Sequence, residues 1–295
     1  MPELLNEHRC FGGSQRFYRH DSRAIGLPMR FSVFVPPVKT GVTLPVVFFL
    51  AGLTCTEETF MTKAGAQRIA AEEGVILVAP DTSPRGANVP GEADSWDVGT
   101  GAGFYVDATE SPWAEHYRMY SYILELRELV LALLPADARR CGIFGHSMGG
   151  HGALVLALRN PSLFRSVSAF APIAAPMQAP WGKKAFSAYL GPNEDRWRAY
   201  DASALMASSQ QPFPQGILID QGEADQFLAG QLYPDVFAAA CERAGQPLAL
   251  RHHAGYDHGY YFISTFIADH LRFHRRLLGH GGAAPVPDAP GSLMP

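Results

Sequence analysis

The chain has 295 residues, of which 47% are hydrophobic and 18% are charged, so it can bury the core of one large domain or two smaller ones. Its net charge of −4 gives no electrostatic reason to expect nucleic acid or an anionic membrane as a partner. We find no apolar run long enough for a signal peptide or a membrane helix. The four cysteines are scattered without CxxC spacing, which predicts reduced thiols in a cytoplasmic protein.

Short apolar runs alternate along the chain with longer segments of helical spacing. Strands are expected at residues 29–35, 45–51, 74–80, 140–144, 166–172, 216–222 and 248–254. Helices are expected at 115–134, 148–159 and 232–244. This alternation predicts an α/β fold with a mainly parallel central sheet of about eight strands and helices on both faces. The two early strands have no helix between them, which suggests an antiparallel edge.

No internal repeat or break in composition divides the chain. We therefore expect residues 1–278 to form a single catalytic domain. Residues 279–295 are rich in Gly, Pro and Ala and offer almost nothing to bury, which predicts a disordered C-terminal tail.

One glycine-rich segment places a serine at a sharp bend. The pentapeptide GHSMG (145–149) fits the GxSxG nucleophile elbow, in which a strand-to-helix turn exposes the serine hydroxyl. The alternative is an ordinary Gly-Ser turn without chemical function. The expected strand 140–144 precedes the bend, and a helix that ends at Asn160 follows it. This context favours Ser147 as a nucleophile.

A serine nucleophile needs a general base and a third group that orients the base. In folds with this elbow, the acid and then the histidine follow the serine along the chain. The preferred acid is Asp225, because its rivals Asp220 and Glu223 belong to the strand or its very end. The preferred base is His258, which follows strand 248–254. Each of these side chains then lies just beyond the carboxyl end of a strand, where open α/β sheets place their sites.

Two histidines bracket the elbow and raise the question of a metal site. His146 and His151 have no HExxH pattern and no convincing third ligand, so packing and hydrogen bonding around the turn explain them better. His252 and His253 alternate along a strand, which predicts one packed and one exposed ring. We expect neither a metal nor a cofactor.

The reaction also needs hydrogen-bond donors for the oxyanion of a tetrahedral intermediate. The backbone N–H of Met148, directly after the nucleophile, is one expected donor. The loop AGLTCTEETF (51–60) follows an early strand, and the N–H of Leu53 is the second expected donor. An ordinary turn in which Thr56 caps a helix is the alternative reading of this loop, and both readings can hold together.

Several longer strings of the sequence resemble one enzyme family. GLTCTEETF (52–60), DSWDVGTGAGFYVDAT (94–109), GHSMGGHGAL (145–154), DQGEADQFL (220–228) and GYDHGYYF (255–262) resemble the S-formylglutathione hydrolase, or esterase D, family. The resemblance extends to about Leu278. It implies an α/β-hydrolase fold and a cofactor-free serine thioesterase that hydrolyses S-formylglutathione to formate and glutathione in formaldehyde detoxification.

The family's functional positions coincide with those chosen above. Its triad falls on Ser147, Asp225 and His258, and its oxyanion amides fall on Leu53 and Met148. Relatives commonly dimerise, so a homodimer is expected by analogy.

The resemblance also suggests residues that contact the substrate. Cys55 is expected to line the site as a thiol that is not the nucleophile, and its alternative is a buried cysteine acting as a small hydrophobic residue. Trp96 and Trp181 are expected to wall the glutathione site, or else to pack in the core. Lys183 or Lys184 is expected to meet the glutathione carboxylates, with a solvated surface position as the alternative.

Two other functions remain open on the same residues. A general carboxylesterase or acyltransferase would use the same scaffold and triad. A non-catalytic binding protein that kept the fold would be expected to carry damage in the triad, and the sequence shows none.

Overall fold

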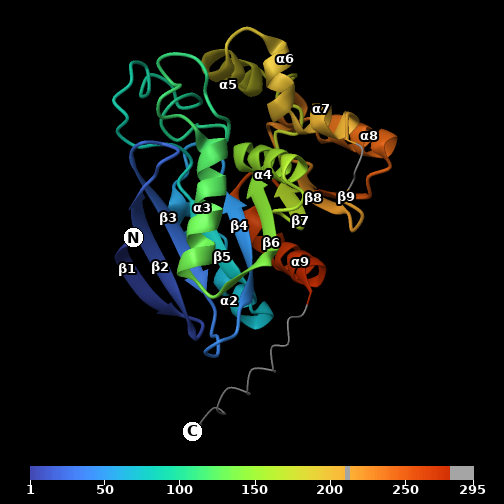
Figure 1. Cartoon of the computed structure of the whole chain (residues 1–295). Helices are drawn as coiled ribbons and strands as arrows, with labels where there is room; N and C mark the ends of the chain where they lie inside the picture. The colour runs from blue at the N-terminus through green and yellow to red at the C-terminus, as the bar shows by residue number, and fades with distance from the viewer. Residues whose placement is uncertain (210–212, 280–295) are drawn as a thin grey trace.

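The computed structural model describes residues 1–209 and 213–279, so the segment predicted as a tail lies outside the described residues from residue 280 onward. Within these described residues, nine strands form one mixed sheet in the order β1-β2-β3-β5-β4-β6-β7-β8-β9 (Figure 1). The fold is thus the expected α/β architecture with a sheet of nine strands. The strands are β1 Glu3–Cys10, β2 Gly13–Asp21, β3 Pro28–Val35, β4 Leu44–Leu50, β5 Ile76–Pro80, β6 Ala136–His146, β7 Ser166–Phe170, β8 Ile217–Gly222 and β9 Leu248–His253.

The N-terminal part of the sheet is antiparallel. β1, β2 and β3 form a meander, and β3 pairs with β5 in antiparallel register. The expected strand 29–35 therefore lies in the antiparallel part, whereas strand 45–51 does not. Its counterpart β4 is central and runs parallel to both β5 and β6.

The six strands β5, β4, β6, β7, β8 and β9, in their order in the sheet, run parallel to one another. β4, β5 and β7 are buried at every residue, because helices cover both faces of the sheet. In Figure 1, α3 and α4 lie on the near face, and α2 and α9 lie on the far face. The helices are α1 Glu57–Lys63, α2 Ala66–Glu73, α3 Met119–Leu133, α4 Met148–Arg159, α5 Pro180–Leu190, α6 Glu194–Trp197, α7 Ala202–Ala207, α8 Pro234–Ala244 and α9 Tyr260–Leu278, with a 3₁₀ turn at Arg198–Tyr200 and a π turn at Leu228–Leu232.

The parallel strands end at one edge of the sheet, where connecting segments gather. β6 leads directly into α4 at this edge, and α5 and α6 lie beyond it (Figure 1). The segments that follow β4, β8 and β9 begin at the same edge because these strands are parallel to β6. The fold therefore brings together residues that lie more than a hundred positions apart in the sequence. No helix among the described residues is both long enough and apolar enough to cross a membrane.

Candidate active site

Ser147 occupies the bend between β6 and α4, as the elbow motif predicts. Its backbone has φ 58° and ψ −119°, which is a strained conformation for a residue other than glycine. The Ser147 N–H donates to the Phe170 carbonyl at 3.0 Å, and its carbonyl accepts from the His151 N–H at 3.0 Å. These bonds hold the strained turn in place.

The glycines of the motif are required by close backbone contacts. A Cβ at position 145 would lie 2.2 Å from the Gly149 carbonyl oxygen. A Cβ at position 149 would lie 1.9 Å from the Leu50 carbonyl oxygen on the neighbouring strand. Only glycine allows the start of α4 to approach β4 this closely, which explains the spacing of the motif.

His258 and Asp225 meet across the ends of β9 and β8. The Nδ1 of His258 lies 2.5 Å from Oδ2 of Asp225. Asp225 has a fully buried side chain, and its carboxylate also accepts from the Phe227 N–H at 2.8 Å and from Gln221 Nε2 at 3.3 Å. The side chain of His258 remains 15% exposed. A carboxylate fixed in this way orients the imidazole and stabilises its protonated form.

The two rival acids are placed elsewhere. Asp220 is fully buried and forms a bidentate ion pair with Arg251. Burial alone would raise its pKa, but hydrogen bonds from His270 and Arg251 hold the pKa of Asp220 well below its usual value. Glu223 is exposed. Within the described residues, neither carboxylate forms an ion pair or hydrogen bond with His258.

The imidazole of His258 lies beside the elbow. Its ring centroid is 4.4 Å from that of His146, the residue directly before Ser147. Ser147 is only 3% exposed. Among the described residues, no hydrogen bond joins the Ser147 hydroxyl to His258; in serine hydrolases such bonds often tighten only when substrate binds.

The loop after β4 lies against the elbow. A Cβ on Gly52 would lie 3.2 Å from the Ser147 Cβ, so the loop next to Leu53 passes close to the predicted nucleophile. Met148 is the first residue of α4, and its N–H has no acceptor within the helix. The hydrogen bonds of the described residues leave the N–H groups of Leu53 and Met148 without a protein acceptor. Both amides are thus available as donors beside Ser147.

The helix cap expected of Thr56 in the 51–60 loop is present in the structure. Thr56 is the N-cap of α1, where its hydroxyl accepts from the Glu58 N–H at 3.3 Å, and the Thr56 N–H donates to the Thr59 hydroxyl at 3.0 Å. Cys55 lies just before this cap and is partly buried. Burial raises the pKa of the Cys55 thiol, which outweighs the hydrogen bonds from Thr59 and Tyr260. The thiol is therefore protonated at neutral pH.

A row of aromatic rings leads from the surface to the imidazole. Trp96 is 55% exposed and meets Trp181 edge-on at a centroid distance of 5.4 Å. Trp181 contacts Phe227 at 4.8 Å, and Phe227 meets His258 edge-on at 5.0 Å. The sequence did not indicate Phe227, whose position in DQFL directly after the predicted acid was the only available signal.

The two candidate lysines differ in their surroundings. Lys184 contacts Asp97 at 2.5 Å and Ser95 at 2.8 Å. Lys183 is exposed on α5 and has no ion-pair partner among the described residues. Lys183 therefore has the freer ammonium group.

Three further serine–histidine contacts lie inside the protein. His274 bonds Ser166 at 2.7 Å and Ser168 at 2.9 Å, while His270 bonds Ser168 at 2.8 Å and lies 3.3 Å from Asp220. Each of these side chains is at most 1% exposed, between β7, β8 and α9. No substrate carbonyl can reach these hydroxyls, so this network is structural.

The remaining histidines have structural surroundings. His151 is fully buried, and its Nε2 lies 2.9 Å from the Phe104 carbonyl. His252 is exposed and His253 is partly buried, as their alternation predicts. Over residues 1–209 and 213–279, the structure contains no group of three or more His, Cys, Asp or Glu side chains placed to hold a metal ion.

Comparison with known proteins places this site in a family. The family described as "Putative esterase" matches residues 22–273. S-formylglutathione hydrolases of Mus musculus and Rattus norvegicus are 55% and 53% identical to the chain over 276 residues, which cover 93% of this chain and 98% of each relative. A solved structure of an S-formylglutathione hydrolase from Agrobacterium tumefaciens is 49% identical, with a TM-score of 0.91 over 94% of this chain and 99% of that one. The chain therefore belongs to the S-formylglutathione hydrolase family of esterases.

Proposed function

We propose that the protein hydrolyses S-formylglutathione to formate and glutathione through an acyl-enzyme intermediate on Ser147. The observation that carries this proposal is the 2.5 Å contact of His258 Nδ1 with the buried Asp225, next to a serine held in a strained elbow. The relatives that share about half of its residues bear the name of this activity.

Acylation begins when His258 removes the proton from the Ser147 hydroxyl. The serine oxygen attacks the thioester carbonyl, and the carbon–sulfur bond then breaks. Asp225 accepts the Nδ1–H bond, which keeps Nε2 free to take the proton and stabilises the imidazolium that forms. Since a thiol has a pKa near 8.5, the glutathione thiolate leaves more readily than an alkoxide would. The thiolate then takes the proton from His258, which returns the imidazole to its neutral form before water attacks.

Deacylation repeats the same steps with water as the nucleophile. His258 takes a proton from water, the formyl ester of Ser147 is cleaved, and the serine regains its proton. In both halves the N–H groups of Leu53 and Met148 bind the oxyanion. Loss of one such donor typically raises the barrier by about 3 kcal/mol. This mechanism requires no cofactor or metal.

We assign the glutathione moiety to the aromatic row. Trp96 and Trp181 offer flat apolar surfaces that lead toward His258. Lys183, whose ammonium is unpaired among the described residues, is the proposed partner for a glutathione carboxylate, and Cys55 is proposed to line the site near the oxyanion loop. Lys183→Ala should raise KM for S-formylglutathione, whereas KM for an uncharged ester should stay the same. An unchanged KM for both substrates would remove Lys183 from the site.

A general carboxylesterase on the same triad is the competing function. The test is a comparison of kcat/KM for S-formylglutathione and p-nitrophenyl acetate with the purified protein. We expect a far higher value for S-formylglutathione. A higher value for the ester would favour the carboxylesterase. We further propose a cytoplasmic homodimer; the cytoplasmic setting is consistent with four free cysteines.

A further inference from the structure

The loop that carries the Leu53 amide contains a strained residue. The Cys55 N–H donates to the Gly52 carbonyl at 3.3 Å, which closes a turn with Leu53 and Thr54 at its centre. Thr54 has φ 66°, a left-handed conformation that a β-branched residue rarely adopts. Local preferences of the sequence therefore do not favour this turn, and contacts from other segments must hold it.

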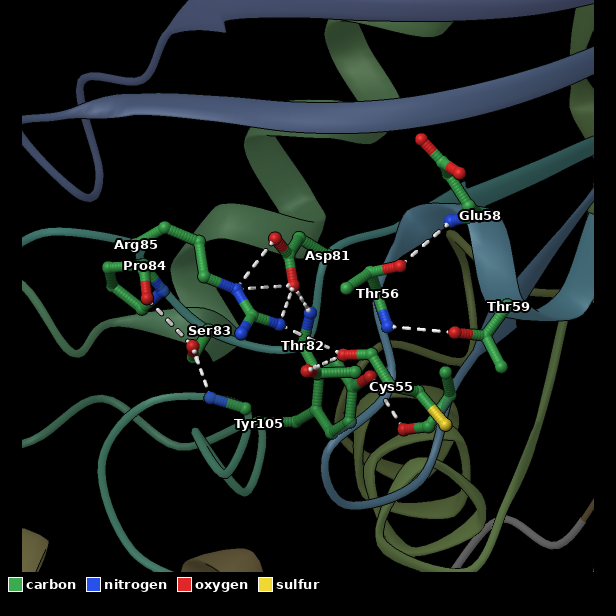
Figure 2. A network of polar contacts seen from close by, with 12 residues as sticks. Cys55, Thr56, Glu58, Thr59, Asp81, Thr82, Ser83, Pro84, Arg85 and Tyr105 are labelled. Carbon is green, nitrogen blue, oxygen red and sulfur yellow. Dashed lines mark hydrogen bonds and ion pairs between the residues drawn. The ribbon is translucent and has the colours of Figure 1, made fainter. Parts of the chain in front are cut away.

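These contacts come from the segment directly after β5. The Cys55 carbonyl accepts two side-chain hydrogen bonds, from Thr82 Oγ1 at 2.6 Å and from Arg85 Nη2 at 3.0 Å. Figure 2 shows the Arg85 guanidinium linked both to this carbonyl and to the Asp81 carboxylate. The end of the turn that contains Leu53 is thus hydrogen-bonded to the charged guanidinium of Arg85.

The arginine is itself held firmly. Its Nε lies 3.0 Å from Asp81 Oδ2 and its Nη2 lies 2.6 Å from Asp81 Oδ1, which is the bidentate geometry of a strong ion pair. The Asp81 side chain is 4% exposed and that of Arg85 is 38% exposed. Asp81 also accepts from the Thr82 N–H at 2.7 Å, so one carboxylate orients both donors to Cys55.

The same segment supports the turn by a second route. The Thr54 N–H donates to the Gly101 carbonyl at 2.9 Å, and the Gly101 N–H donates to the Ser83 hydroxyl at 2.7 Å. Residues 81–85 therefore hold the Cys55 carbonyl directly and the Thr54 N–H through Gly101. We call Asp81, Thr82 and Arg85 the loop clamp.

We propose that Arg85, anchored by Asp81, is a positioning residue that fixes the oxyanion loop through the Cys55 carbonyl and so aims the Leu53 N–H at the reacting carbonyl oxygen. The inference rests on the proposed acyl-transfer function. It assigns a role to an ion pair that touches neither the substrate nor the triad. A backbone N–H stabilises the oxyanion less well when its peptide group can rotate away from the reacting oxygen.

The test uses the variants Arg85→Ala and Arg85→Lys, with Arg30→Ala as the matched control. Arg30 lines the same surface hollow as Arg85 and forms no ion pair among the described residues. We expect Arg85→Ala to lower kcat about 10- to 100-fold for both S-formylglutathione and p-nitrophenyl acetate, with KM changed less than threefold. Arg85→Lys should recover part of the loss, millimolar guanidinium should partly rescue Arg85→Ala, and Arg30→Ala should match the parent.

A second measurement separates positioning from general damage. Affinity for a trifluoromethyl ketone, which forms a tetrahedral adduct with the serine, should fall with kcat/KM across the variants. Affinity for S-methylglutathione, which forms no oxyanion, should not change. If Arg85→Ala fails to fold, Thr82→Val removes the other donor to Cys55 and should show the same pattern with a smaller loss.

The outcomes distinguish this inference from the function on which it rests. A folded Arg85→Ala variant with kcat within twofold of the parent would overturn the clamp. So would equal losses of affinity for the ketone and for S-methylglutathione. If the parent cleaves only p-nitrophenyl acetate, the assigned substrate is wrong, and the clamp is still decided by the ester kinetics because all acyl substrates use the same oxyanion site.

Discussion

The imidazole rings of His146 and His258 lie against each other, with centroids 4.4 Å apart and planes inclined at 47°. His146 is 6% exposed, and neither of its ring nitrogens has a hydrogen-bond partner among the described residues. Burial, and secondly the nearby His258, lower the pKa of His146 well below its usual value. The ring therefore stays neutral and supports His258 by contact rather than by proton transfer.

Replacing His146 tests this supporting role. His146→Leu retains most of the side-chain volume and removes two unpaired polar atoms, so we expect kcat within about fivefold of the parent and an equal or higher unfolding temperature. His146→Ala leaves a gap beside His258 and should lower kcat about tenfold or more. Esterase kinetics and thermal unfolding of both variants measure these effects. An inactive but folded His146→Leu protein would show that the ring takes part in proton transfer.

The thiol of Cys55 should be dispensable for turnover. Cys55→Ser keeps a small side chain beside the oxyanion loop, and we expect it to retain most of the parent activity. Because burial raises the pKa of the thiol above its ordinary value, the thiolate is scarce near neutral pH. Alkylation by iodoacetamide should therefore accelerate as the pH rises toward and beyond 9, and this phase should be missing from Cys55→Ser. A dead Cys55→Ser enzyme would mean that the nucleophile has been misassigned.

Buried histidines should make the fold sensitive to mild acid. Burial lowers the pKa of His151 to about 4 and lowers those of His146 and His274 well below 6.5. The unfolded chain therefore binds more protons below pH 6.5, so the free energy of unfolding is highest above that pH and falls as the pH decreases. Between pH 7.5 and 5.5, the free energy of unfolding should fall by about 1.4 kcal/mol for each ring that stays neutral in the folded protein. For the three rings together the fall should be about 4 kcal/mol.

Urea unfolding at several pH values measures this loss. His151→Gln can keep a hydrogen bond to the Phe104 carbonyl and does not titrate. The free energy of unfolding of this variant should therefore fall by about 1.4 kcal/mol less than that of the parent over the same pH range. A stability that stays flat between pH 7.5 and 5.5 would contradict the assignment of neutral buried rings.

The parts of the fold that the sequence predicts are those with continuous apolar runs. Strand 74–80 corresponds to β5, and helix 148–159 coincides with α4, because the parallel sheet demands buried strands and the elbow demands a helix. β1 and β2 were not predicted. Every residue of β1 before Cys10 is exposed, so the strand forms through pairing with β2 and not through burial of an apolar face.

In the candidate site too, some residues could be predicted from the sequence and others could not. Chain order and strand ends single out Asp225 and His258, whose side chains meet in the structure. The loop clamp escaped prediction because Asp81 and Arg85 follow a strand that carries no known motif. They act on Leu53 through the Cys55 backbone carbonyl, and the spacing of residues in a sequence does not predict a contact of this kind.

The most direct test of the account is the initial rate of S-formylglutathione hydrolysis by the purified parent protein and by Ser147→Ala. Removal of a triad serine leaves only the contributions of binding and the oxyanion donors, so we expect the variant to retain about a thousandth of the parent rate or less. Circular dichroism of the variant serves as the control for folding. A folded Ser147→Ala protein that keeps more than about a tenth of the parent rate would contradict the assignment of Ser147 as the nucleophile.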